Sequence, residues 1–223
     1  MVTAVIPVRA GSQRVKNKNL RPFANSSLLD IKIEVLKKVV NIDRIIVNTD
    51  SDIALDVARR HGVIGVRRAA YYASSKCSGS EYFEHLGRVT ETDVFVYAPV
   101  TSPLVRSRTI ENCVAEYLSG KDCFDSIATV SDVKEFLWLD GKAINYNPAN
   151  APNSQNLPNV VALNFACSVI SRDNLIRFRN IIGARPRFVT IDEVEAVDVD
   201  TPLDYFIAEQ LYKRIVLAGE ILS

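Results

Sequence analysis

A cationic stretch lies between Arg9 and Arg21, where five arginines and lysines surround a single glycine, Gly11. Gly11 and Ser12 permit a close backbone approach, so amide N–H groups can face phosphate oxygens while the cations neutralise them. The spacing matches neither G-x-x-x-x-G-K-[ST] nor G-x-G-x-x-G, so neither a P-loop nor a dinucleotide fingerprint is supported. A solvated basic turn is the alternative, but crowded cations directly after a buried strand favour a site that an anion visits.

Two aspartates near the C-terminus, Asp198 and Asp200, stand on either side of Val199. In a strand, residues i and i+2 share a face, so the two carboxylates are expected to project together. Mg²⁺ is commonly held by one or two carboxylates plus substrate phosphates, which suits such a pair. A role as caps of a strand–helix junction is the alternative. Together with the cationic stretch, however, a triphosphate–metal site explains both features.

The segments that carry these residues alternate between short apolar runs and helical patterns. Strands are predicted at residues 3–8, 44–48, 63–66, 93–98, 126–130 and 160–170, and at 197–200 with Val197 and Val199 facing the core. Helices are predicted with the apolar stripes Leu29-Ile33-Leu36-Val40, Ile53-Val57, Tyr82-Phe83-Leu86-Val89, Ile110-Val114-Leu118 and Leu203-Phe206-Ile207-Leu211, the last one capped by Thr201 and Pro202. This alternation predicts βαβ units and a mainly parallel sheet. Ligands of such sheets bind beyond the carboxyl ends of the strands, where the cationic stretch lies.

Residues 145–159 differ in composition, with three prolines and six asparagines in fifteen residues. Such a segment predicts an irregular excursion, and long loops within a compact domain are usually functional or contact a partner. We therefore expect one domain over residues 1–223, with an insertion at residues 131–165.

Composition narrows the classes of function. A hydrophobic fraction of 48% and a charged fraction of 24% indicate a folded globular chain, and a net charge of +1 argues against a binder of nucleic acid. The four cysteines form no C-x-x-C pair, and with only two histidines a zinc site is not expected. We found neither a signal-peptide pattern nor an apolar run long enough to span a bilayer, so a cytoplasmic protein without membrane contact is expected.

Five motifs resemble, in order, those of the acylneuraminate (nonulosonic acid) cytidylyltransferases. They are Ile6-Pro7-Val8-Arg9-Ala10-Gly11-Ser12 with Lys16-Asn17-Lys18-Asn19, Asn48-Thr49-Asp50-Ser51, Thr101-Ser102-Pro103-Leu104, Leu163-Asn164, and Asp198-Val199-Asp200-Thr201-Pro202. The resemblance implies a three-layer α/β/α fold with a mainly parallel, Rossmann-like nucleotidyltransferase sheet. It also implies that CTP and a 2-keto-3-deoxy sugar acid react to give a CMP-sugar for cell-surface polysaccharide, with release of pyrophosphate.

The resemblance also implies residue roles. It assigns catalysis to Arg9, Lys18 and Asp200. It assigns CTP binding to Arg9, Ala10, Gly11, Ser12, Lys18, Asn19, Arg68, Thr101 and Ser102. Asn164 and Gln155 are expected at the sugar acid, Asp198 and Asp200 at Mg²⁺, and the insertion at the substrate pocket and at a homodimer contact.

The chain departs from the family pattern at Gln13, where many members have lysine, and at Pro99, where glutamine is common. Two alternatives therefore stay open. One is a cytidylyltransferase for another acid, such as 3-deoxy-manno-octulosonate or a phosphonate, and the other is a non-catalytic nucleotide-binding relative.

Overall fold

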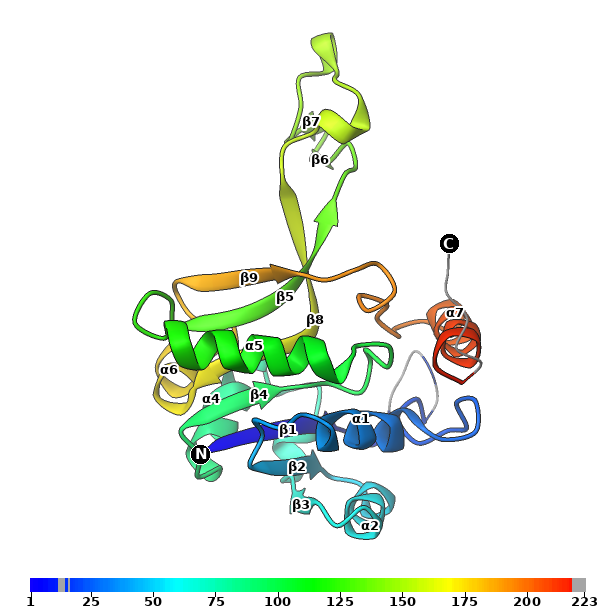
Figure 1. Cartoon of the computed structure of the whole chain (residues 1–223), viewed down its shortest axis with the longest axis vertical. Coiled ribbons are helices and arrows are strands. Elements are labelled where there is room, and N and C mark those ends of the chain that lie inside the picture. The colour runs from blue at the N-terminus through cyan, green and yellow to red at the C-terminus, as the bar shows by residue number, and fades with distance from the viewer. Residues whose placement is uncertain (12–14, 16, 218–223) are drawn as a thin grey trace.

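The computed structural model describes residues 1–11, 15 and 17–217, so Ser12 and Gln13 lie outside the described residues (Figure 1). Seven strands form the central sheet in the order β3-β2-β1-β4-β8-β5-β9. Their bounds are Val2–Val8 (β1), Arg44–Thr49 (β2), Ile64–Arg67 (β3), Val94–Tyr97 (β4), Ser126–Val133 (β5), Val160–Ser171 (β8) and Pro186–Thr190 (β9). Of these strands only β8 runs against its neighbours, because it pairs antiparallel with both β4 and β5. The predicted mainly parallel sheet is confirmed.

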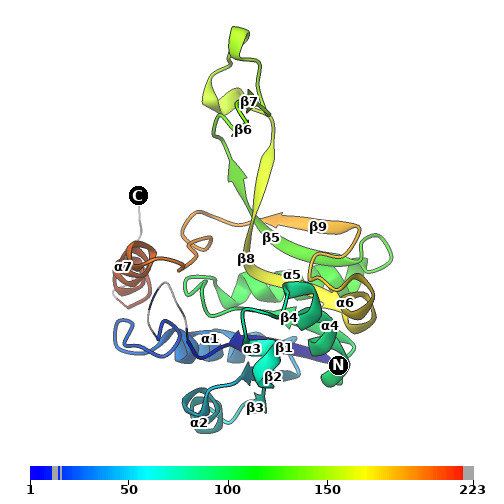
Figure 2. The same cartoon turned by 180° about the vertical axis from the view of Figure 1, so that it is seen from behind.

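Helices cover both faces of this sheet, which gives the predicted three layers (Figures 1 and 2). One face carries α1 (Leu28–Lys37), α2 (Asp52–Arg60) and α5 (Ser107–Gly120), and the other carries α4 (Gly79–Val89) and α6 (Arg172–Phe178). Side-chain alternation in β1 divides the core between the two faces. Ala4, Ile6 and Val8 pack with the first set of helices, whereas Val5 packs with the second. The short α3 (Ala70–Ala73) follows β3, and α7 (Pro202–Leu211) continues into a π-helical turn, η3 (Tyr212–Leu217).

Residues 131–165, here called the arm, project away from the body of the molecule (Figures 1 and 2). Its base is a two-stranded ribbon in which Ser131 to Val133 of β5 pair with Val160 to Ala162 of β8. The tip holds the small hairpin β6 (Trp138–Leu139) and β7 (Lys142–Ala143) and two 3₁₀ turns, η1 (Pro148–Asn150) and η2 (Ser154–Asn156). The tip is built around aromatic contacts rather than a deep core, since Phe136 and Trp138 both meet Tyr146 edge-on.

Each of the five predicted apolar stripes is wrong in part, and those of α1, α2 and α7 differ most. In α1, Val40 is exposed because the helix ends at Lys37, and Val39 takes the buried position. In α2, Ile53 is exposed and Ala54, Val57 and Ala58 are buried instead.

The third corrected stripe belongs to α7, where Leu203, Phe206 and Ile207 point to solvent. The helix buries Tyr205 and Ala208 instead. Its orientation follows from Tyr205, whose hydroxyl donates to Pro22 O at 2.7 Å and whose ring meets Phe23 edge-on. The exposed face of α7 is therefore apolar.

Two single positions and one segment also differ from expectation. Val89 and Leu118 are exposed at the ends of otherwise buried stripes in α4 and α5. Residues 197–200 form no strand, although Val199 is fully buried and its N–H donates to Thr101 O at 2.8 Å. Over the described residues, no helix combines the length and apolarity that crossing a membrane requires.

Candidate active site

A cavity of about 550 Å³ opens at the carboxyl ends of β1, β3 and β4. Its walls come from the end of β1 and the following loop, from the segment between β3 and α4, and from the turn that follows β4. The sequence-predicted residues Arg9, Lys18, Asn19, Arg68, Thr101 and Asp200 all line it. The sheet thus brings together side chains that are up to 191 positions apart in the sequence.

Lys18 is one of the cations that line this cavity, and it is only 9% exposed. Its Nζ donates to Val199 O at 2.6 Å and lies 3.3 Å from Asp200 Oδ1. Asn19 donates from Nδ2 to Arg9 O at 3.2 Å, which holds the residue after Lys18 against the end of β1. These contacts tie the loop after β1 to the aspartate motif near the C-terminus.

Asp198 and Asp200 lie close enough to interact electrostatically. Burial raises the pKa of Asp198, and the Asp200 carboxylate raises it further, while a hydrogen bond with Thr101 and the charge of Lys18 act in the opposite direction. Two neighbouring carboxylates of this kind repel each other and favour a bound cation. No cluster of three or more His, Cys, Asp or Glu side chains able to hold a metal occurs among the described residues. Asp200 lines the cavity, and Asp198 is not part of the lining. The two carboxylates could hold Mg²⁺, which commonly takes its remaining ligands from phosphate and water.

Arg68 is held in place by a buried network at the opposite wall. Its Nε donates to Asn48 Oδ1 at 2.7 Å, and its Nη2 donates to Asn48 O at 2.8 Å and to the Tyr82 hydroxyl at 2.9 Å. The guanidinium also lies 4.3 Å from the centre of the Tyr82 ring. Burial raises the pKa of Tyr82, so its hydroxyl stays protonated and donates to Asn48 Oδ1. A guanidinium fixed in this way presents a rigid cation to a ligand.

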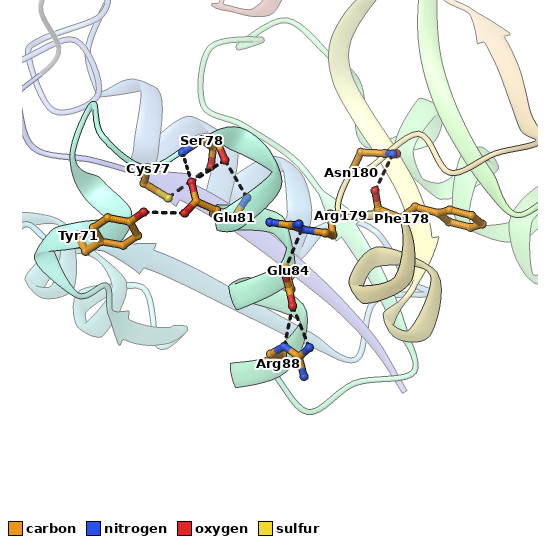
Figure 3. Close-up of polar contacts among 9 residues, drawn as sticks. All are labelled: Tyr71, Cys77, Ser78, Glu81, Glu84, Arg88, Phe178, Arg179 and Asn180. Carbon is orange, nitrogen blue, oxygen red and sulfur yellow. Dashed lines mark hydrogen bonds and ion pairs between the residues drawn. The ribbon is translucent and has the colours of Figure 1, made fainter.

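The wall beside Arg68 is stiffened by the first turn of α4, shown in Figure 3. Ser78 and Glu81 form a reciprocal capping box. The Tyr71 hydroxyl donates to Glu81 Oε1 at 2.6 Å, and this bond, with those from Ser78, lowers the pKa of Glu81 to about 2. One turn later, Glu84 pairs with Arg88 and with Arg179 beyond α6 (Figure 3). The wall is thereby anchored to two helices.

Figure 3 also places Cys77 directly before this cap, where its thiol donates to Ser78 O at 3.4 Å. Cys77 lines the cavity, and burial raises the pKa of its thiol. The cap of α6 is stabilised separately, since Asn180 donates to Phe178 O at 3.0 Å.

Several sequence-predicted site residues lie outside the cavity lining. Ala10 and Gly11 border a neighbouring hollow, where Ala10 N donates to Asp50 Oδ1 at 2.7 Å. Gly11 has φ +78°, which explains a glycine there. Ser102 is fully buried behind the cavity, and Ser12 lies outside the described residues.

The two residues predicted at the sugar acid are on the arm. Asn164 donates from Nδ2 to Ser131 Oγ at 3.0 Å, and Gln155 is exposed in η2. Among the described residues of the arm, none lines the cavity.

Several residues at or behind the cavity were missed by sequence reasoning, among them Tyr82, Cys77 and Lys32. Tyr82 was treated as a core residue because of its helical spacing. Lys32 carried a signal that could have been used, since it stands three residues after Leu29 and four before Leu36, within the buried stripe of α1.

The fold and this cavity define an α/β nucleotidyltransferase. Residues 3–151 match the profile of the family described as Cytidylyltransferase, and the chain belongs to that family. It is 24% identical to post-translational flagellin modification protein B of Campylobacter coli, over 96% of this chain and 95% of that protein.

Two further comparisons are with a longer relative and with a solved structure. It is 24% identical to N-acylneuraminate cytidylyltransferase of Escherichia coli over 96% of this chain, which spans 52% of that longer protein. A solved structure of CMP:2-keto-3-deoxy-manno-octonic acid synthetase complexed with CTP superposes with a TM-score of 0.70 at 14% identity, covering 99% of both chains. At this identity the superposition shows the fold alone.

Proposed function

We propose that the chain transfers CMP from CTP to the anomeric hydroxyl of a nonulosonic, sialic-type acid and releases pyrophosphate. The observation that carries the proposal is the convergence of Lys18, Arg9 and Arg68 with Asp200 in one cavity at the carboxyl ends of the strands. The match to an N-acylneuraminate cytidylyltransferase extends over 96% of this chain, whereas the match to a 3-deoxy-manno-octulosonate cytidylyltransferase extends over 68% of it, which supports the first class of acceptor.

In this reaction the acceptor hydroxyl attacks the α-phosphorus in line, and negative charge accumulates on the phosphate oxygens. Lys18 and Arg9 neutralise that charge, and Lys18 is already oriented by Val199 O. Asp198 and Asp200 would hold Mg²⁺, which when bound neutralises phosphate charge and polarises the α-phosphate. Catalysis of this kind depends on positioning and on charge, so no covalent intermediate with the protein is required.

A measurement of pyrophosphate release shows which of the candidate acceptors the enzyme uses. The wild-type chain is incubated with CTP, Mg²⁺ and in turn N-acetylneuraminate, 3-deoxy-manno-octulosonate and a 2-hydroxyethylphosphonate control. We expect turnover with the nonulosonic acid in preference to the other two. Turnover with only 3-deoxy-manno-octulosonate or only the phosphonate would assign the acceptor to that class instead. CTP binding without pyrophosphate release in the presence of any of the acids would support a non-catalytic relative.

We also propose a homodimer in which the arm contacts a second copy. Trp138, Leu139 and Ile144 on the arm are each more than half exposed, as are Leu203 and Phe206 on α7. Apolar side chains gathered on a projecting segment are typical of surfaces that a partner covers.

A further inference from the structure

Lys32 is a lysine in the core of the molecule. It lies in the buried stripe of α1, and its side chain is 0% exposed. Its Nζ donates a hydrogen bond to Ser102 O at 2.8 Å. Ser102 itself is fully buried, and its Oγ has no protein partner among the described residues.

Stability does not explain a lysine at this position. Burial lowers the pKa of Lys32 to about 7, while the charges of Cys167 and Asp198 act in the opposite direction. Methionine or leucine would fill the same space without the desolvation cost, and such replacements of buried charged groups are often neutral or stabilising. The amine therefore has a role other than packing.

The turn that accepts the Lys32 hydrogen bond also supports the aspartate motif. Thr101 lies on the cavity side of this turn, and its carbonyl accepts a 2.8 Å bond from Val199 N. The Thr101 side chain is also hydrogen-bonded with Asp198. Val199 O in turn accepts from Lys18 Nζ. A continuous set of contacts thus runs from α1 through the turn to both carboxylates and to the cation of the cavity.

We propose that Lys32 is a positioning residue, whose Nζ anchors the Thr101–Ser102 turn from behind and thereby fixes Asp198 and Val199 relative to Lys18. The inference rests on the proposed function, because it assigns Lys32 to the metal side of that same site. Lys32 lies behind the turn and does not line the cavity, so it acts through Ser102 and Thr101 rather than on the nucleotide.

The test compares Lys32→Met, which keeps length and removes the donor, with Lys32→Gln, which keeps a donor. Lys38→Met is the control, since Lys38 is exposed at the C-cap of the same helix. We expect kcat of Lys32→Met to fall about tenfold to a hundredfold. The concentration of Mg²⁺ that gives half-maximal activity should rise, and KM for CTP should change little.

A second readout does not depend on turnover. Mn²⁺ is titrated into each enzyme with CTP and followed by electron paramagnetic resonance. We expect Lys32→Met to bind Mn²⁺ about tenfold more weakly than wild type and the Gln variant to recover part of the loss. Wild-type behaviour of Lys32→Met, or a lower kcat with unchanged Mn²⁺ affinity, would overturn the proposal.

Two further outcomes are distinguished by the same design. If both Lys32 variants lack a cooperative unfolding transition, Lys32 is a folding residue and the inference is wrong. If wild type releases no pyrophosphate with any acid, the proposed function fails, while the Mn²⁺ titration still decides the role of Lys32.

Discussion

At the scale of single residues, the cavity contains a cation and a carboxylate that are already in contact. Lys18 lies between Val199 O and Asp200, so it is fixed before any phosphate arrives. Among the described residues, the four charged residues of the cavity lining are Arg9, Lys18, Arg68 and Asp200, and we expect them to act through their charge rather than as nucleophiles. The chemistry is therefore electrostatic, and the consequences of substitution depend on charge and position.

Asp200→Asn should test the carboxylate directly. The substitution keeps the shape of the side chain and removes the negative charge, so we expect kcat to fall by about a hundredfold or more. Pyrophosphate release at saturating CTP measures the loss. The matched control is Asp56→Asn on α2, where an exposed carboxylate pairs with nearby Arg59. Full activity of Asp200→Asn would remove Asp200 from the metal site.

Lys32 should also affect stability in a pH-dependent way. Because its pKa falls from 10.5 to about 7 on folding, the folded state binds fewer protons than the unfolded state between these values. The wild-type free energy of unfolding therefore gains a contribution as pH rises from 7 toward 10. We expect Lys32→Met to be more stable than wild type by about 2 kcal/mol at pH 7, with a smaller difference near pH 9.5.

Urea unfolding followed by circular dichroism at both pH values measures this difference, with Lys38→Met as the control. A Lys32→Met protein that is less stable than wild type at pH 7 would show that the buried amine stabilises the fold.

At the scale of elements, α1 and α2 are joined through the C-cap of α2. His61 Nε2 lies 2.7 Å from Asp30 Oδ1, and its Nδ1 lies 2.9 Å from Glu34 Oε1, both carboxylates being on α1. Burial raises the pKa of Asp30, but hydrogen bonds from Ser27 and His61 outweigh it and leave the pKa below its ordinary value. Bonds from Lys37 and then His61 lower the pKa of Glu34. The helix pair is thus stabilised by ionised carboxylates.

This junction should weaken in acid. A carboxylate with a lowered pKa stabilises the fold fully above its unfolded pKa, and the contribution is lost as pH falls through the folded value. We expect His61→Ala to lower the free energy of unfolding by about 1 kcal/mol near neutral pH. The difference from wild type should shrink below about pH 4.

Urea midpoints measured across this pH range provide the test. Arg59→Ala on the same helix is the control, since its exposed pair with Asp56 should contribute little. A His61→Ala deficit that is independent of pH would show that the imidazole acts through packing alone.

The helices and strands also show which parts of the structure could be predicted from the sequence. Short buried strands and the helix cap at Thr201 were predictable because apolar periodicity and capping chemistry are local. The cluster of Arg9, Lys18 and Asp200 was predicted because one triphosphate–metal site beyond the carboxyl end of the first strand explains both the cationic stretch and the aspartate pair. Lys32 was missed because lysine normally faces solvent, although its position within the apolar stripe of α1 indicated burial. The exposed face of α7 was also missed, because tertiary contacts of Tyr205 decide which side of an apolar helix is buried.

At the scale of the whole molecule, the body and the arm differ in how they bury apolar surface. The body has a core on each face of the sheet. The arm has a ribbon and a small aromatic cluster, and it leaves Trp138 54% and Leu139 62% exposed. Asn164 and Gln155 belong to the arm, so a role at a sugar acid requires that the arm meet a cavity, in the same copy or in a second one.

The proposed dimer can be tested by measuring the mass of the protein in solution. Light scattering after size exclusion at micromolar concentration should give twice the mass of one chain, and Trp138→Glu should shift the protein toward monomer. We expect the dissociation constant to rise at least about tenfold, because a charge in the centre of an apolar contact must be desolvated. Ile53→Glu is the matched control, since Ile53 is 66% exposed on α2, at the opposite end of the molecule from the arm (Figures 1 and 2). A monomeric wild type would contradict the proposed dimer. If both variants remain dimeric, the contact lies away from the arm, and the apolar face of α7 is the next surface to substitute.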